Sequence, residues 1–161
     1  LININNKRNL EFIWNIIGDG PSKKLLQKIV EESTIKNNVI FHGFVSEKRK
    51  RDFLLDSDLF LMPGYMAEKS IEGFGIVYAE AASYGIPSIG GVDGGAPEAV
   101  IHNETGWCVD PKNSKLLEET ILKATENKKL REKLGENAKI YFKKRFSSEI
   151  AFYNLINLLK S

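Results

Sequence analysis

Short apolar runs alternate with amphipathic stretches along roughly the first two thirds of the chain. Apolar runs that end at glycine or proline are typical of buried strands, whereas apolar residues three and four positions apart indicate helices. We expect strands at 10–17, 38–42, 58–62, 86–90 and 106–109, and helices after Pro21, over 46–56 and 75–84, and as a short turn at 97–101. This alternation favours an α/β fold with a parallel sheet and helices on both faces.

The chain becomes helical after Pro111 and shows no strand pattern beyond it. One apolar stripe is formed by Leu117, Ile121 and Ala124, and a second by Phe152, Leu155, Ile156 and Leu159. The charged stretch 126–133 between them is typical of a connection between helices rather than of a linker between domains. We therefore expect a single domain over residues 1–161.

Candidate chemistry centres on Glu72 and Glu80, which flank the segment Gly73-Phe74-Gly75. If the glycines form a turn and a helix begins near Gly75, the free N–H groups of the first helical turn form an anion site for a diphosphate. Glu80 then lies about 7.5 Å further along the helix axis, where a carboxylate can accept hydrogen bonds from ribose hydroxyls. Glu72, before the turn, is placed to face a sugar.

Five ordered segments resemble the family 4 (group 1) retaining glycosyltransferases. They are Ile17-Gly18-Asp19-Gly20-Pro21, the strand and turn 39–45, Glu72-Gly73-Phe74-Gly75-Ile76 with Glu80, Gly94-Gly95-Ala96-Pro97-Glu98, and Thr105-Gly106-Trp107-Cys108-Val109. The resemblance covers roughly residues 10–146. It implies one half of a GT-B fold, namely the Rossmann-like C-terminal lobe that binds the sugar nucleotide.

The resemblance also implies roles for single residues. Glu72 would be the catalytic residue, contacting hydroxyls of the transferred sugar. Backbone groups at Phe74, Gly75 and Ile76 would meet the sugar and the diphosphate, and Glu80 would bind the ribose. The turn at Phe44 and Val45 would form part of the base pocket through its backbone, although ordinary core packing is an equal alternative for these two residues.

The reaction that the resemblance implies moves a sugar from a nucleoside diphosphate sugar to an acceptor hydroxyl. It needs no metal and no cofactor, because positive groups and a helix N-terminus stabilise the leaving diphosphate. The expected partners are the donor and an N-terminal lobe that holds the acceptor. The chain begins inside an expected helix, without the family's first strand and its Arg and Lys segment. We therefore expect a truncated piece that is inactive alone.

Three alternatives remain open. The first is a nucleotide-sugar binding module without activity of its own. The second is a part of a sugar-nucleotide epimerase, which has the same two-lobe architecture. A nicotinamide oxidoreductase is the least favoured, because Gly18-Asp19-Gly20 lacks the third glycine of a dinucleotide fingerprint and has Lys23 in its place. That segment fits a plain strand-to-helix turn.

Composition narrows the partners and the compartment. The 23 basic and 21 acidic residues give a net charge of +2, which does not favour nucleic acid as a partner. The single cysteine, Cys108, and the two histidines, His42 and His102, form no cluster at metal-ligand spacing. His42 fits a core histidine and His102 a surface loop. No apolar run is long enough to cross a bilayer, and no signal peptide is visible, so we expect a cytoplasmic protein.

Two basic runs, Lys48 to Arg51 and Lys143 to Arg145, are typical of solvated helix faces. The alternative is attraction to anionic lipid headgroups at the inner face of a membrane. By resemblance, many members of the family modify membrane-bound or lipid-linked acceptors. Two departures from the family pattern are Gly64, where serine is commoner, and Gly90-Gly91 at the end of a strand usually richer in Val, Ala and Thr.

Overall fold

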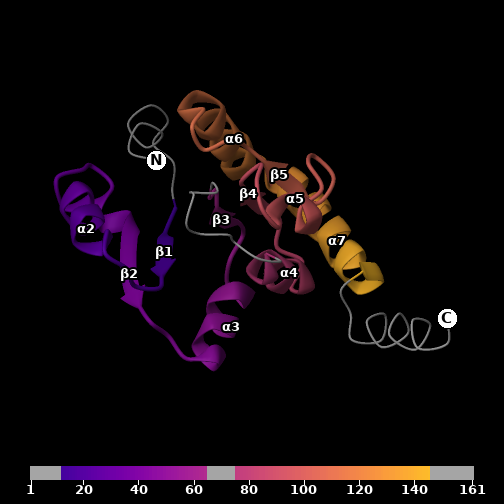
Figure 1. Cartoon of the computed structure of the whole chain (residues 1–161), viewed down its shortest axis with the longest axis horizontal. Coiled ribbons are helices and arrows are strands. Elements are labelled where there is room, and N and C mark those ends of the chain that lie inside the picture. The colour runs from indigo at the N-terminus through magenta and orange to yellow at the C-terminus, as the bar shows by residue number, and fades with distance from the viewer. Residues whose placement is uncertain (1–11, 65–74, 146–161) are drawn as a thin grey trace. The chain divides into compact units, whose positions relative to one another are not determined.

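The computed structural model of the chain describes residues 12–64 and 75–145 (Figure 1). Contacts between Cα atoms divide the chain into two compact units, Leu1–Asp56 and Ser57–Ser161, which we call unit 1 and unit 2. The sequence analysis expects a single domain, and no change of composition marks position 56. The division follows from strand pairing, since the two sheets of the described residues fall one in each unit.

Unit 1 is built on two parallel strands. β1 (Trp14–Ile17) pairs with β2 (Val39–Gly43), with Trp14 opposite Val39 and a shift of register between Ile16 and Ile17. The strands are connected by α2 (Lys23–Glu31) and the 3-10 helix η1 (Lys36–Asn38), and α3 (Glu47–Leu55) follows β2. Parallel strands require a crossover of this kind, so the expected order of strand and helix is confirmed here.

The two α-helices of unit 1 begin differently. The Ser46 side chain accepts a hydrogen bond from the Arg49 N–H at 3.3 Å and so caps the N-terminus of α3. Ser22 occupies the corresponding position before α2, but its side chain makes no capping hydrogen bond. The expected strand 10–17 is seen from Trp14 onward, and residues 10 and 11 lie outside the described ranges.

Unit 2 holds a three-stranded parallel sheet in the order β3-β4-β5. Its elements are β3 (Phe60–Met62), α4 (Ile76–Ser83), β4 (Ser88–Gly90), α5 (Ala96–Ala99), β5 (Gly106–Cys108), α6 (Ser114–Glu126) and α7 (Lys128–Arg145). The register places Ser88 of β4 between Phe60 of β3 and Gly106 of β5. The expected turn at 97–101 is shifted to 96–99, because Val100 already has extended backbone.

The core of unit 2 lies between its sheet and its helices. Tyr78 of α4, Ile89 of β4 and Trp107 of β5 are almost completely buried. α4 packs on β4, α7 packs on β5, and the two helices contact each other. A Cβ at Gly135 of α7 would overlap with the carbonyl oxygen of Gly85, so glycine there lets the two backbones approach closely.

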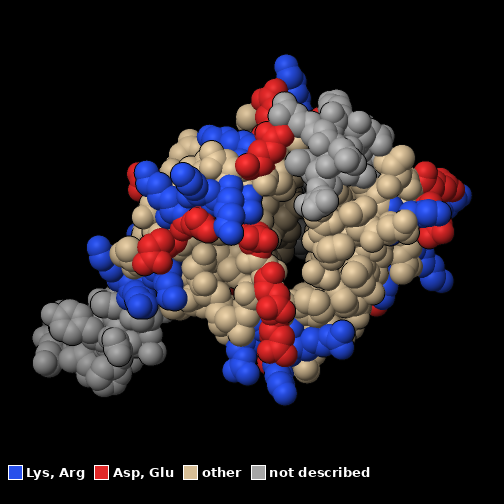
Figure 2. All heavy atoms as spheres, turned by 180° about the vertical axis from the view of Figure 1, so that it is seen from behind, with Lys and Arg blue, Asp and Glu red and all other residues tan. Residues whose placement is uncertain are grey.

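The surface of unit 2 carries many charges on its long helices. In Figure 2, blue lysine and arginine side chains gather over α7, with fewer acidic side chains among them. Of the helices in the described ranges, none combines the length and the apolar character that crossing a bilayer requires.

Candidate functional site

The site begins at the N-terminus of α4. Gly75 precedes the helix with φ +60° and ψ 35°, a left-handed backbone, and no side chain caps the helix start. The Tyr78 N–H donates to the Gly75 carbonyl oxygen at 2.9 Å, so the N–H groups of Ile76 and Val77 come before the first intrahelical bonds. The expected helix start near Gly75 is confirmed. These N–H groups and the positive end of the helix dipole suit an anion.

Gly75 cannot be replaced without strain, for two reasons. Its positive φ is a conformation that residues with a Cβ rarely adopt. A Cβ there would also lie 2.9 Å from Tyr78 Cδ2 and 3.0 Å from the Gly95 carbonyl oxygen. The turn is therefore held close to α4 and to the loop before α5.

Glu80 lies on α4, four residues after Ile76. Positions four apart lie on the same face of a helix, about 6 Å apart along its axis. Glu80 is half-buried, whereas Ile76 is 67% exposed at the beginning of the helix. The structure thus brings together Gly75, Ile76 and Glu80. Glu72 and Phe74 lie outside the described residues.

Tyr78 packs against the turn at Gly75. Its role was not predicted from the sequence. Its hydroxyl donates to the Met62 carbonyl oxygen at 2.5 Å, at the end of β3. Its ring meets Phe60 edge-on, with centroids 5.7 Å apart, and also packs beside Gly90. The available signal was a lone tyrosine in the alanine-rich segment 76–83. Tyr78 therefore joins the carboxyl ends of β3 and β4 to the start of α4.

The structure explains the departure from the family pattern at Gly90-Gly91, and nothing in it explains glycine at position 64. A Cβ at Gly91 would overlap with the carbonyl oxygen of Gly64. The loop after β3 thus packs directly on the backbone after β4, and only glycine at position 91 leaves the room. Gly90 is also tight, because a Cβ there would lie 3.1 Å from Ala96 Cβ.

The segment Gly94 to Glu98 makes structural contacts. Gly94 has φ +65°, which favours glycine. Gly95 has φ −78°, a backbone that any residue adopts, and its carbonyl group lies close to Gly75. Pro97 lies in the first turn of α5, and the Glu98 carbonyl oxygen accepts from the Tyr141 hydroxyl at 3.0 Å.

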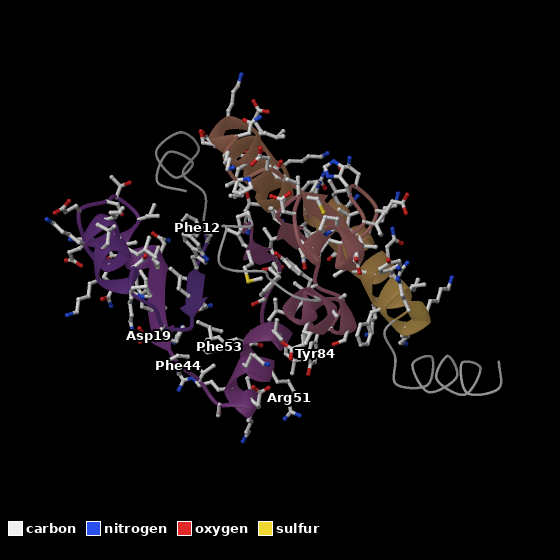
Figure 3. The ribbon with its side chains drawn as sticks, in the orientation of Figure 1. Phe12, Asp19, Phe44, Arg51, Phe53 and Tyr84 are labelled. Carbon is white, nitrogen blue, oxygen red and sulfur yellow. The ribbon has the colours of Figure 1, made fainter. Side chains whose placement is uncertain are left out.

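In unit 1 the turn after β2 holds Phe44 and Val45. Phe44 is 85% exposed and Val45 is half-buried, so core packing is the wrong interpretation for Phe44 within the described residues. Gly43, with φ +66°, directs the chain out of the strand. Figure 3 shows Phe44 and Asp19 at the carboxyl end of the β1–β2 pair. An exposed aromatic ring at this edge is a surface for a planar ligand.

Asp19 organises the turn after β1, and its side chain was not singled out from the sequence. Its Oδ1 accepts from the Gly20 N–H at 2.8 Å, and its Oδ2 pairs with Lys23 Nζ at 2.6 Å. The hydrogen bond from Lys23, and after it the one from Gly20, lowers the pKa of Asp19 below its ordinary value of 3.8. The Gly18 N–H donates to the Gly43 carbonyl oxygen at 2.8 Å. The plain turn expected at 18–20 is confirmed.

The histidines and the cysteine make structural contacts. His42 Nε2 lies 2.8 Å from Asn15 Oδ1, and its ring packs against Phe53. The Cys108 N–H donates to Nδ1 of the exposed His102 at 3.1 Å. Burial raises the pKa of the Cys108 thiol, which keeps it protonated. Within 12–64 and 75–145, no group of three or more His, Cys, Asp or Glu is placed to hold a metal ion.

The described residues form parallel α/β units, and in unit 2 the N-terminus of α4 has no side-chain cap. In open α/β folds, ligands bind at the carboxyl ends of the parallel strands. The pattern of one family, described as "Glycosyl transferases group 1", matches residues 2–141. The chain therefore belongs to the group 1 glycosyl transferases. Its fold is α/β and Rossmann-like, one half of a GT-B fold.

Among curated proteins, the chain is similar to the GDP-mannose-dependent alpha-(1-6)-phosphatidylinositol monomannoside mannosyltransferase of Mycobacterium tuberculosis. The two are 38% identical over 100 residues, which is 61% of this chain and 26% of the relative. The chain thus spans about a quarter of the length of this curated relative.

Two solved structures have a similar fold. Anabaena Alr3699/HepE in complex with UDP-glucose superposes with a TM-score of 0.80 at 24% identity, covering 99% of this chain and 44% of the other. The C-terminal domain of a glycosyl transferase group 1 family protein, LpcC from Francisella tularensis, gives 0.79 at 23% identity, covering 91% of this chain and 75% of the other.

Proposed function

We propose that this chain is the donor-binding lobe of a retaining glycosyltransferase, which moves a sugar from a nucleoside diphosphate sugar to an acceptor hydroxyl. The observation that carries the proposal is the start of α4. Gly75 is held in a left-handed turn by its neighbours, the helix has no side-chain cap, and Glu80 lies one turn further on. This geometry occurs in a chain of the group 1 family.

The diphosphate of the donor would lie against the N–H groups of Ile76 and Val77. A helix N-terminus stabilises a nearby negative charge by about 0.3–1 kcal/mol when exposed and up to about 2 kcal/mol when partly buried. The same groups would stabilise the charge that develops on the leaving diphosphate, without a metal ion or cofactor. Gly75 lets the phosphate oxygens approach the backbone, because no side chain stands in front of it.

The two carboxylates would have different tasks. Glu80 would accept hydrogen bonds from the ribose hydroxyls, which binds the nucleotide equally before and during the reaction. Glu72, with the backbone at Phe74, would orient the transferred sugar as positive charge develops at its anomeric carbon. Loss of Glu80 would then weaken binding, whereas loss of Glu72 would lower the rate of transfer.

The base would bind at the turn of Phe44 and Val45 in unit 1. The exposed Phe44 ring supports this role, because a nucleobase can stack on it. The relative from M. tuberculosis is named for GDP-mannose and the HepE structure holds UDP-glucose, so the family resemblance leaves the base and the sugar open.

The chain spans about a quarter of the length of its mycobacterial relative, which leaves room in such a protein for a further lobe. We propose that the acceptor binds on a second, N-terminal lobe and that this chain alone transfers no sugar.

A lipid-linked acceptor at the inner face of a membrane fits the name of the mycobacterial relative, which acts on a phosphatidylinositol monomannoside. We therefore propose a cytoplasmic protein in glycolipid or polysaccharide synthesis. An epimerase of the same architecture would instead change the donor without any acceptor, so product analysis with and without an acceptor separates the two.

The decisive experiment is a titration of the chain with UDP, GDP and ADP and with their sugar conjugates, followed by calorimetry. We expect one nucleotide series to bind, and Glu80→Gln to weaken it about tenfold, the value of one strong hydrogen bond of about 1.4 kcal/mol. Glu119→Gln is the matched control, because this glutamate is exposed on α6. Absence of binding by every nucleotide, or equal loss in both variants, would remove the proposed donor site.

The role of Glu72 needs a protein in which this chain is joined to an acceptor-binding lobe. Glu72→Gln should there lower kcat strongly while the Kd of the donor changes little, because the side chain acts on the reacting sugar. A change in Kd alone would assign Glu72 to binding instead.

A further inference from the structure

Helix α7 concentrates the positive charge of unit 2. Its 18 residues include eight basic and two acidic side chains, a net charge of +6, whereas the whole chain has +2. The exposed basic residues lie toward the two ends of the helix. They are Lys128, Lys129, Lys133, Lys143, Lys144 and Arg145. In Figure 2, blue side chains gather over this helix with red ones among them.

Few of these basic side chains form an ion pair or a ring contact with another described residue. Lys128 lies 3.8 Å from Glu132, with both side chains largely exposed, and Arg145 lies over the Tyr141 ring at 5.9 Å. Lys129, Lys133, Lys143 and Lys144 form no ion pair with any described residue. Their charge is therefore open to solvent.

The stability of the helix does not explain the charge at its start. Lysines in the last turn complement the helix dipole, but Lys128 and Lys129 lie in the first turn, where positive charge is unfavourable and acidic residues are absent. Lys129 and Lys133 are also four residues apart, a spacing at which like charges repel. The arrangement destabilises α7 slightly, and among the lysines at its start only Lys128 has an ion pair with a described residue.

The opposite face of α7 is firmly held. Leu134, Gly135 and Ala138 are buried, and Asn137 Nδ2 donates to the Glu104 carbonyl oxygen at 2.9 Å. The Tyr141 hydroxyl donates to the Glu98 carbonyl oxygen at 3.0 Å. The lysines therefore project from a fixed helix, about 27 Å long at 1.5 Å rise per residue, together with the exposed Glu132 and Glu136.

We propose that the exposed face of α7 docks on a membrane surface rich in anionic lipid headgroups. Clusters of four to eight Lys and Arg on one helix suffice for attraction to such a surface. Ile140, 43% exposed, lies four residues before Lys144 and adds an apolar side chain to the basic face. Tyr141 and Phe142 are half-buried, so α7 offers no exposed aromatic ring for stacking on nucleic acid bases.

The test measures flotation of the 161-residue chain with vesicles of phosphatidylcholine alone or mixed with phosphatidylglycerol. One variant carries Lys129→Gln, Lys133→Gln, Lys143→Gln and Lys144→Gln. The control carries Lys24→Gln, Lys36→Gln, Lys115→Gln and Lys123→Gln, exposed lysines away from α7, so both variants lose the same charge. We expect the wild type to float only with anionic vesicles, and the α7 variant to lose at least about tenfold in partitioning.

Two further measurements complete the test: the salt dependence of vesicle binding and a comparison with binding to single-stranded RNA. Binding should fall sharply between about 0.1 M and about 1 M NaCl, since the screening length shrinks from about 10 Å to about 3 Å. Equal losses in both variants would overturn the proposal in favour of a net-charge effect. Failure to float with anionic vesicles, or tighter binding to single-stranded RNA than to the vesicles, would also overturn it. A folding control is the emission of Trp107, and the double variant Lys129→Gln with Lys133→Gln replaces the larger one if that is unfolded.

Discussion

The two units of this chain differ in how completely they are packed. Of the buried apolar residues among those described, unit 1 contributes two, Ile35 and Val39, whereas unit 2 contributes fourteen. Unit 1 also leaves Ile13 of its strand region 60% exposed. Two strands with one helical crossover cannot enclose a core, whereas three strands covered by α4 and α7 can. We infer that unit 2 contributes most of the free energy of folding and that unit 1 has exposed apolar surface.

Replacing Gly91 by valine should abolish the packing of unit 2. The new side chain would overlap with the Gly64 backbone, and overpacking of this kind costs about 3 kcal/mol. Urea unfolding followed by the emission of Trp107, in a Trp14→Phe background, measures the loss. Gly20→Ala is the control, since a Cβ at Gly20 meets nothing within 4 Å. An unchanged midpoint for the Gly91 variant would mean that the loop after β3 lies elsewhere.

Hydrogen exchange compares the two units directly. Amides of β4 and β5 should exchange at least about a hundredfold more slowly than those of β1 and β2, because a strand that is buried on both sides opens only with its whole unit. Mass spectrometry of peptides from residues 14–17 and 106–108 provides the two rates. Equal protection would show that the two units unfold together, which would contradict the proposed difference in their stability.

Arg131 should contribute to the stability of unit 2. Its guanidinium Nη1 donates to the Ala124 and Thr125 carbonyl oxygens at 2.8 Å each, at the end of α6, and Nη2 lies 3.6 Å from Asp58. Arg131→Ala should lower the free energy of unfolding by about 2 kcal/mol, because it leaves two carbonyl groups without their donor. Lys123→Ala, an exposed change on α6, should have little effect. Similar midpoints for both variants in thermal unfolding would contradict this.

The N-cap of α3 should contribute less and should act on unit 1. Ser46→Ala removes the hydrogen bond to the Arg49 N–H and should destabilise the unit by about 0.5–1 kcal/mol. Ser22→Ala is the matched control, because Ser22 precedes α2 without capping it. The emission of Trp14 in a Trp107→Phe background reports the change, and equal effects of the two serine variants would refute the assignment.

The smallest expected effect is on the titration of Asp19. Lys23→Gln removes the main hydrogen bond that lowers its pKa, so the pKa should rise toward the ordinary value of 3.8. Because the folded pKa is lowered, the stabilisation exists above the unfolded pKa and is lost as the pH falls through the folded one. An NMR titration of the Asp19 carboxyl carbon between about pH 2 and pH 6 covers both values. An unchanged curve would show that Gly20 alone sets the pKa.

The order and type of the elements follow from local patterns in the sequence. Apolar runs that end at glycine or proline located the five strands of the described residues, and apolar residues three and four positions apart located the helices. The glycines of the segment 73–75 also indicated the turn before α4, and Gly75 has the left-handed backbone of such a turn.

Which parts of the chain contact each other depends on the fold in space. The division into two sheets depends on hydrogen bonds between distant strands. The exposure of Phe44 depends on what packs around it, and sequence cannot distinguish an exposed aromatic residue from a buried one. The link from Tyr78 to Met62 and the packing of Gly64 on Gly91 join residues at least sixteen positions apart. Such contacts follow from the chain path in space, which no local pattern encodes.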